Sequence, residues 1–509
     1  MAQLIPSLAT LVAAFHDCFH PQVFQTFQAL LAGWIICQGP RTLSEVWLAT
    51  SWAAKRHHDT AYAVFHSAAW EWDDLGVVLA TLVLTHLVPG GVAWIVVDDM
   101  LCHKRGAKVA FGGIFLDAVL STKKHKTMRF GLNWIVLGIA VPLPLRPDRY
   151  YCLPVLWRCY RKKGQPGYKS RTRLAAELAH HLAERLPERT FWLVGDSAYI
   201  NSELMKGRPG NLQVLGPLRW DAALYEVPGP YPGQGRPAKK GRRLPTPLAM
   251  IEDTATYPAR QRTIRFPKLA RRLRIQVVRD VLWYTGCGES PVMVVLVRDP
   301  LGQWRDEVLV ATDPEASAAF AIRGYCRRWS IELAFFDSKQ YLGLHDPRVW
   351  SERSVERAHP MAWFVGTLTV LWYAVSGHAG AQVQRERTWY PDKVTPTFSD
   401  MLGALRLQMW QHRVYGASGA EVPGLRPISW SKDNGSHWCG CSVANGSFEF
   451  SSIGTYLTQV DANSAGVLYS RELCGRSVLY SSFQSAPNAR ACGSLSNSSR
   501  SKNSSRNLL

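Results

Sequence analysis

The chain has 509 residues, of which 47% are hydrophobic and 19% are charged, and this excludes a wholly disordered protein. Its formal net charge of +20 favours a polyanionic partner, with nucleic acid as the first candidate and an anionic membrane surface as the second. The 11 cysteines show no spacing typical of a zinc site, which predicts a reduced cytoplasmic protein without a structural metal.

Residues 1–90 are predicted to form a helical domain. Apolar residues recur at helical spacing along this segment, and Thr42 followed by Glu45 predicts the start of one helix. Two short helices with basic residues between them suggest a helix-turn-helix that enters a DNA groove. An ordinary helical bundle that packs on the next domain fits the same pattern equally well.

The uncharged stretch Leu75–Val97 is long enough to cross a membrane. Pro89-Gly90-Gly91 interrupts it, and we therefore expect a buried helix, a turn and a buried strand. The opening residues Met1–His20 carry no basic segment and no clear cleavage site, so no secretory signal is expected.

Two apolar runs are followed by acidic residues. Trp94–Val97 is predicted to be a buried strand that ends at Asp98 and Asp99, and Phe191–Val194 is predicted to be another that ends before Asp196. Between them lie two strand-like runs and a helix with leucines at i, i+4 spacing: Trp134–Val141, Tyr151–Tyr160 and Thr172–Leu186. The pattern predicts a mixed α/β core over residues 91–207 and 316–350.

The remaining segments differ in composition. Residues 208–315 combine Pro, Gly and basic clusters with short strand-like runs, which predicts a β-rich insertion in the core. Apolar helices are expected over 351–418. Residues 419–509 are rich in Ser and have no sustained period, so they are predicted to be a disordered tail. A foreign extension from a frameshifted or truncated reading frame is the alternative.

Tyr325–Lys339 contains no Pro or Gly and is predicted to be a helix. On a helix, Tyr325, Arg328, Glu332 and Lys339 fall within an arc of roughly 60°. A carboxylate among cations on one face suits a metal-associated phosphate. A solvated face with incidental ion pairs is the simpler interpretation.

Three carboxylates are therefore candidates for one site: Asp98 or Asp99, Asp196, and Glu332. Three carboxylates suit a pair of Mg²⁺ ions, which prefer oxygen ligands and bind beside substrate phosphates. A single strand-end Asp more often caps a loop or a helix. The three together in a strongly basic chain favour a metal site.

The order Asp, Asp, Glu, with the Glu in the pattern Tyr-x₂-Arg-x₃-Glu-x₆-Lys, resembles the signature of bacterial insertion-sequence transposases of the DDE type. Tyr325, Arg328, Glu332 and Lys339 match that pattern at every position. Gly195–Tyr199 resembles the motif of the second acid. Val97–Met100 resembles that of the first, although Met100 departs from the usual residue. The resemblance covers about Phe24 to Met409, and its register favours Asp99 over Asp98.

The resemblance implies an RNase H-like mixed-sheet catalytic core with a β-rich insertion, flanked by an N-terminal helical domain that binds DNA ends and by C-terminal helices. It implies that Asp99, Asp196 and Glu332 are the catalytic, metal-binding acids and that Tyr325, Arg328 and Lys339 bind DNA phosphates. Two Mg²⁺ ions, which Mn²⁺ can replace, would serve strand cleavage and 3′-hydroxyl strand transfer.

The expected partners are the terminal inverted repeats of a transposon, the target DNA and a second copy of the chain, in a bacterial cytoplasm and associated with the nucleoid. Two other functions compete with this one. The first is an inactive transposase-derived DNA-binding protein, and the second is a metal-dependent endonuclease without strand transfer.

Overall fold

The computed structural model describes residues 4–106, 108–231, 233, 235–378, 393 and 395–415, all within one compact unit that the contacts define over Met1–Gly419. The predicted tail of residues 419–509 lies outside the described residues.

The N-terminal segment is helical from its first described turn to Leu87. Its five α-helices are α1 (Pro6–Ala13), α2 (Pro21–Ile36), α3 (Leu43–Leu48), α4 (Asp59–His66) and α5 (Trp72–Leu87), with a short 3₁₀ helix at His16–Cys18. Thr42 caps α3 as expected, because its hydroxyl accepts a hydrogen bond from the Glu45 amide at 3.3 Å. Residues 49–58 join α3 to α4, which is longer than the tight turn of a helix-turn-helix, and both helices pack on α2. This packing favours the bundle interpretation.

The predicted sequence of helix, turn and strand in Leu75–Val97 is confirmed. Helix α5 ends at Leu87 and strand β1 (Ala93–His103) begins after the Pro-Gly-Gly turn. Among the described residues, no helix combines the length and the apolar character that a bilayer crossing requires.

The core sheet consists of β1 with β3 (Met128–Leu143), β4 (Arg146–Cys159), β5 (Phe191–Val194) and β6 (Leu212–Pro217). Strand β3 pairs antiparallel with both β1 and β4, whereas β5 runs parallel to β1 and β6 runs parallel to β5. The resulting order, β4-β3-β1-β5-β6, with helix α6 (Arg171–Arg185) before β5, is the α/β arrangement of an RNase H-like core.

One expectation for β1 is corrected. The sequence suggested that this strand ends at Asp98 and Asp99, but it continues to His103 because β3 pairs with it as far as His103 opposite Gly131. Both acids therefore lie inside a paired strand, where successive side chains point to opposite faces of the sheet.

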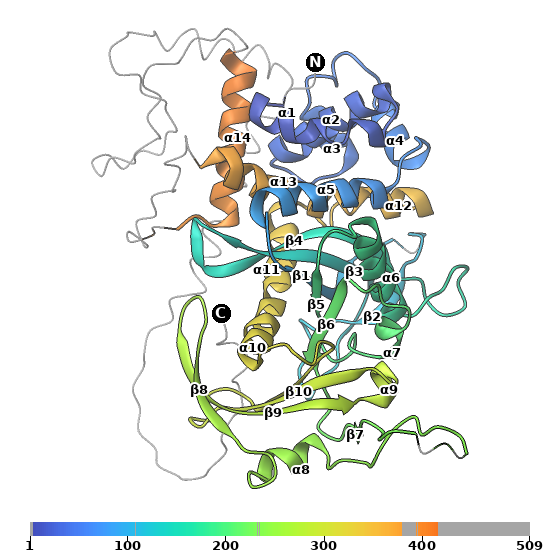
Figure 1. Cartoon of the computed structure of the whole chain (residues 1–509). Coiled ribbons are helices and arrows are strands. Elements are labelled where there is room, and N and C mark those ends of the chain that lie inside the picture. The colour runs from blue at the N-terminus through green and yellow to red at the C-terminus, as the bar shows by residue number, and fades with distance from the viewer. Residues whose placement is uncertain are drawn as a thin grey trace, which may run out of the picture. The chain divides into compact units, whose positions relative to one another are not determined.

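The segment between the second acid and Glu332 is β-rich, as expected, and its strands continue the core sheet (Figure 1). Strand β11 (Glu307–Ala311) pairs with β6, β10 (Pro291–Arg298) pairs with β11, and β9 (Ala270–Leu282) pairs with β10. Strands β7 (Tyr225–Glu226) and β8 (Arg260–Arg265) both pair with β9, and β2 (Gly113–Leu116) pairs with β3 at the opposite end of the sheet. Short helices lie between them: α7 (Ser202–Met205), α8 (Pro247–Glu252) and α9 (Tyr284–Cys287).

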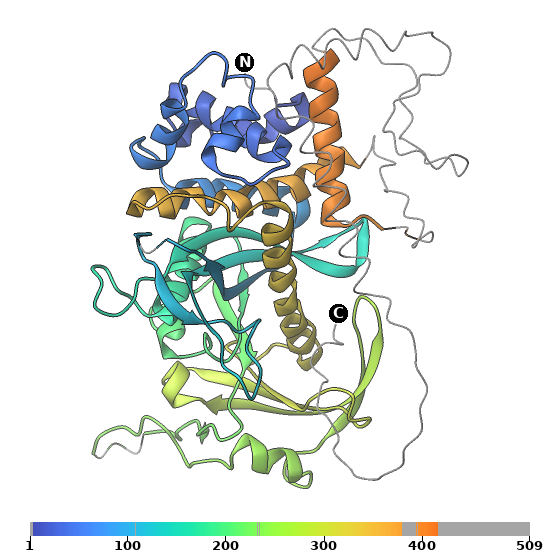
Figure 2. The same cartoon turned by 180° about the vertical axis from the view of Figure 1, so that it is seen from behind.

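The predicted helix at Tyr325–Lys339 consists of three consecutive pieces. They are α10 (Ala318–Cys326), a 3₁₀ turn at Arg327–Trp329 and α11 (Ser330–Tyr341). Together they form a nearly continuous column from the insertion strands to the C-terminal helices (Figures 1 and 2). Those helices are α12 (Glu352–Ala358), α13 (Met361–Trp372), a π-helical turn at Tyr373–Gly377, and α14 (Phe398–Tyr415).

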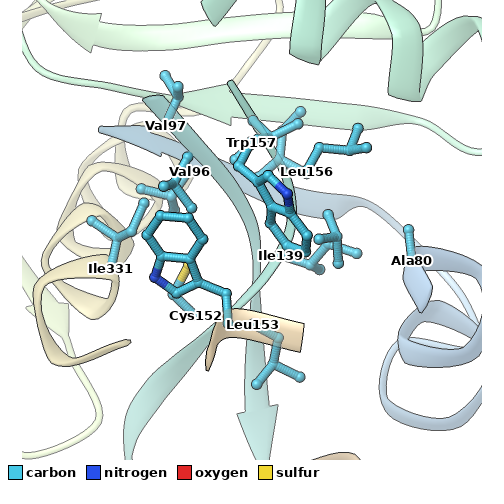
Figure 3. Close-up of a cluster of buried hydrophobic side chains, with 14 of the residues drawn as sticks. Ala80, Val96, Val97, Ile139, Cys152, Leu153, Leu156, Trp157 and Ile331 are labelled. Atoms are coloured by element: carbon cyan, nitrogen blue, oxygen red, sulfur yellow. The ribbon is translucent and has the colours of Figure 1, made fainter. Parts of the chain in front are cut away.

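Helix α11 is fixed to the sheet by its apolar side chains. Ile331 is fully buried and lies beside Val96 and Cys152 in the cluster of Figure 3. Because Glu332 is the next residue, the burial of Ile331 determines the direction in which Glu332 leaves the helix.

Candidate active site

Asp98 and Asp99 are placed on opposite faces of β1 by the strand's alternation. Trp94 lies on the same face of β1 as Asp98, and α10 approaches it so closely that a Cβ at Gly324 would lie 2.1 Å from its ring. Asp98 therefore lies on the face that α10 and α11 cover. Asp99 points to the other face, towards the N-terminus of α6, where Arg171 lies at 4.0 Å.

The guanidinium of Arg328 connects Asp98 to Glu332. Its Nη1 lies 3.8 Å from Oδ2 of Asp98 and 3.9 Å from Oε1 of Glu332. The Arg328 side chain is buried and its guanidinium stacks on the ring of Trp329, with 4.2 Å between Cζ and the ring centroid. Burying a cation between two carboxylates costs desolvation free energy, so this arrangement is more typical of a functional site than of a structural ion pair.

The third acid, Asp196, lies beside this pair. It follows β5, the strand next to β1, and its negative charge contributes to raising the pKa of Asp98. Its Oδ1 accepts a hydrogen bond from the Ala198 amide at 2.9 Å, so it stabilises the turn after β5. The next helix, α7, begins at Ser202 with Asn201 as its cap, so Asp196 is not a helix cap.

Burial raises the pKa values of Asp98 and Glu332. The pKa of Asp98 rises to about 7, chiefly because the carboxyl is buried and also because Asp196 and Asp99 are negatively charged. The Asp99 amide, which donates to Asp98 Oδ1 at 2.8 Å, and Arg328 oppose this rise. Burial also raises the pKa of Glu332, against the effect of Arg328. The site therefore has more negative charge than Arg328 alone balances.

Asp99 has a different environment. Its Oδ1 accepts a hydrogen bond from the hydroxyl of Tyr199 at 2.8 Å, and its Oδ2 accepts one from the side-chain amide of Asn133 at 2.7 Å. Both donors are almost fully buried. Since Tyr199 comes three residues after Asp196, the hydrogen bond to Asp99 joins the loop after β5 to the acidic pair of β1.

The other predicted residues lie around this centre at different distances. Tyr325 is largely buried, and its pKa rises to about 12 through burial and the nearby charges of Glu307 and Asp196, with a hydrogen bond to Arg328 acting in the opposite direction. Lys339 lies two turns beyond Glu332 along α11, roughly 10 Å away along the axis. It is close to Cys102 and Asp117 at the far end of β1, where burial lowers its pKa.

The structure thus brings together Asp98, Asp196, Glu332, Arg328 and Tyr325. Asp99 is placed on the other face of the strand and Lys339 near its end. Tyr199 and Asn133 were not predicted as functional residues. Tyr199 is part of the motif around the second acid, which is a signal in the sequence, whereas Asn133 has no such signal.

The model of a family described as DDE superfamily endonuclease matches residues 14–287, which is more than half of the chain. The chain belongs to this family. The match includes Asp98, Asp99 and Asp196 and ends before Glu332, so the place of Glu332 in the site depends on the geometry around Arg328. No curated protein matches the chain significantly.

The DDE family generally uses divalent metal ions, and the donor set fits such ions. Asp98, Asp196 and Glu332 supply the hard oxygen ligands that Mg²⁺ and Mn²⁺ prefer. The negative charges of Asp196 and Asp99 near Asp98 would be offset by such an ion. Among the described residues, three metal-ligand atoms lie within 4.8 Å of one another at His57, His58 and Asp59, which are exposed; the three acids are more widely spaced.

Proposed function

We propose that this DDE endonuclease is a DNA transposase that cuts DNA at transposon ends and joins the resulting 3′-hydroxyl to target DNA. The observation that carries the proposal is the pair of contacts from one buried guanidinium, Arg328, to Asp98 and to Glu332, with Asp196 alongside. The net charge of +20 supports a DNA substrate.

We assign Asp98, in place of the expected Asp99, as the first metal ligand. Asp98 shares Arg328 with Glu332, whereas Asp99 faces away and has each of its oxygens hydrogen-bonded. Asp99 then acts as a positioning residue, because its partners Tyr199 and Asn133 fix the backbone on which Asp98 is carried.

The chain's own residues would divide the work as follows. Asp98, Asp196 and Glu332 would hold two Mg²⁺ ions, for which Mn²⁺ can substitute. When bound, such ions activate the attacking water or hydroxyl and stabilise the leaving oxygen. Arg328 would pair with non-bridging phosphate oxygens at the scissile bond. Tyr325 would donate its hydroxyl hydrogen, since its raised pKa keeps it protonated, and Lys339 would contact a phosphate further along the strand.

Two further parts of the proposal concern assembly. The helices of residues 1–90 would contact the terminal repeats, and two copies of the chain would pair the two transposon ends. Joining two ends to one target requires two active sites held together, which is why a homodimer is proposed.

The test combines two DNA substrates. Duplexes with intact element ends report cleavage, and duplexes with a pre-cleaved 3′-hydroxyl report joining to a target plasmid, each with Mg²⁺ or EDTA. We expect Mg²⁺-dependent cutting and joining by the wild type and neither by Glu332→Gln. Cutting without joining would instead support an endonuclease, and binding without cutting would support an inactive DNA-binding protein.

A further inference from the structure

The β2–β3 hairpin, residues 113–131, presents a cluster of apolar side chains to solvent. Val119 is 83% exposed, Ile114 is 56% exposed and Met128 is 53% exposed, and two leucines are also exposed, Leu116 and Leu120. Strand β2 lies at the end of the sheet, and Leu116 pairs with Met128 across the hairpin. Several exposed apolar side chains on one hairpin are typical of an interaction surface.

The exposed charged side chains around this cluster, which form its rim, are all basic. The hairpin carries exposed cationic or titratable side chains that have no ion-pair partner among the described residues: Lys123, Lys124, His125, Lys126 and Arg129. The hairpin's one acid, Asp117, is buried and engaged within the fold. The surface therefore combines apolar side chains with uncompensated positive charge.

Hydrogen bonds brace the tip of the hairpin. Asp117 accepts hydrogen bonds from the amides of Val119 at 3.0 Å and Leu120 at 3.1 Å, and its other oxygen lies 2.6 Å from Nε2 of His103. Further bonds between Ser121 and Thr127 close the turn. A surface that is already ordered loses little conformational entropy when it binds a partner.

The same contact ties the tip to the catalytic strand. His103 is the last residue of β1 and follows Asp98 by five positions, which corresponds to roughly 17 Å of extended strand. This distance is comparable to the width of the major groove of B-DNA, which is about 12 Å, so a hairpin tied to His103 can reach DNA that is bound at the acids.

We infer that the hairpin engages double-stranded DNA beside the cleavage site, with its lysines on phosphates and with Val119 and Leu120 inserted against a base step. Proteins that unstack a base step use this combination of apolar wedge and basic rim. A second copy of the hairpin is a poorer occupant, because self-association would bring the two basic rims together. The inference rests on the proposed function only in taking DNA as the substrate.

Two pairs of substitutions separate the contribution of the basic rim from that of Val119 and Leu120, which we call the wedge. Lys123→Ala with Lys124→Ala should reduce the slope of log affinity against log salt by up to about 1.8, since each lost phosphate contact contributes about 0.9. Val119→Ser with Leu120→Ser should leave that slope unchanged and weaken binding about tenfold, because binding then no longer buries the two apolar side chains. Binding is measured by fluorescence anisotropy on an element-end duplex.

Unstacking of a base step by the wedge can also be measured directly, by a fluorescence change that weaker binding alone does not explain. A duplex with 2-aminopurine near the cleavage position should brighten when the wild type unstacks it and should stay dim with the Val119→Ser, Leu120→Ser variant at saturating protein. The matched controls are Leu248→Ser with Leu301→Ser for the apolar pair and Arg236→Ala with Lys206→Ala for the basic pair, all at exposed positions outside the hairpin. Thermal melting checks that each variant is folded.

The outcomes are distinct. If the hairpin variants match the wild type in affinity, salt slope and 2-aminopurine signal, the inference is wrong while DNA binding itself stands. If the serine pair changes the oligomeric state in light scattering and leaves DNA binding intact, the surface belongs to a second copy and the inference is also wrong. A wild type that binds no DNA overturns the proposed function as well.

Discussion

Asp98 and Asp99 are adjacent in sequence, yet their carboxylates lie in different environments on opposite faces of β1. Asp98 shares a guanidinium with Glu332, and Asp99 is fixed by a phenol and an amide. The choice between them could not be predicted because β1 is buried on both faces. The apolar run Trp94–Val97 does not alternate with polar residues, so it does not reveal which face is which.

The hydrogen bond from Tyr199 to Asp99 is predicted to support metal binding at a distance. Tyr199→Phe removes this donor, which loosens the link between the two acid-bearing strands. We expect the Mg²⁺ concentration for half-maximal cleavage to rise about tenfold, a typical cost of losing a residue that orients a metal ligand. The exposed Tyr168→Phe is the control. An unchanged Mg²⁺ requirement would mean that Tyr199 serves only the packing of the core.

Arg328 is predicted to contact the DNA as well as the acids. Arg328→Ala should weaken binding to a cleaved end and lower the salt slope by about one phosphate contact. The measurement is a salt titration of binding by anisotropy, with Arg185→Ala as the control. A variant that binds more weakly with the wild-type slope would show that Arg328 is a structural partner of Asp98 and Glu332.

At the scale of elements, the sequence predicted that Glu332 lies on a helix at this place, but it did not predict that a 3₁₀ turn divides the helix. The absence of Pro and Gly indicated a helix, and the 3₁₀ turn at Arg327–Trp329 gave no signal in the sequence. The turn lies where α10 meets the sheet closely at Gly324, a contact between residues distant in sequence. Tertiary contacts of this kind are outside the reach of local patterns.

Gly324 is predicted to be required for this close approach. A Cβ at Gly324 would lie 2.1 Å from the ring of Trp94, so Gly324→Ala must displace α10 from β1. We expect a loss of roughly 1–3 kcal/mol in the free energy of unfolding, the usual cost of overpacking. Gly210→Ala, where a Cβ meets nothing within 4 Å, is the matched control. Equal denaturation midpoints for the two variants would contradict the packing described here.

Asp337 makes the stability of α11 dependent on pH. Burial raises its pKa from 3.8 to about 7, with Arg149 opposing the rise. Between these two values the folded chain binds a proton that the unfolded chain has released, so stability from this residue falls as the pH rises from about 4 to about 7. Asp337→Asn removes the effect, and we expect a gain of roughly 1–3 kcal/mol at pH 8 that vanishes at pH 4.

Thermal melts of Asp337→Asn across this range check the prediction, with the exposed Glu188→Gln as the control. A gain that is equal at pH 4 and pH 8 would show that the effect has another origin than ionisation.

At the scale of the whole molecule, the order of predicted segments agrees with the structure better than their pairing does. Strands were expected over 208–315, but the sequence did not indicate that β11 would pair with β6 and extend the core sheet. Strand pairing is set by contacts far apart in the chain, whereas a strand's existence is set by local apolar patterns. The candidate acids could be identified from the sequence because carboxylates next to buried strands are unusual. The face of the sheet on which each acid lies could not be identified, because it depends on how the strands pair.

The central claim is that Asp98, Asp196 and Glu332 form the metal-dependent cleavage site and that Asp99 supports it from the other face. The most direct test is to compare Asp98→Asn and Asp99→Asn in the cleavage of an element-end duplex across a Mg²⁺ titration. We predict that Asp98→Asn abolishes cleavage at every Mg²⁺ concentration, while Asp99→Asn keeps cleavage and needs more Mg²⁺. Full loss in Asp99→Asn with activity retained in Asp98→Asn would contradict the assignment and restore Asp99 as the ligand.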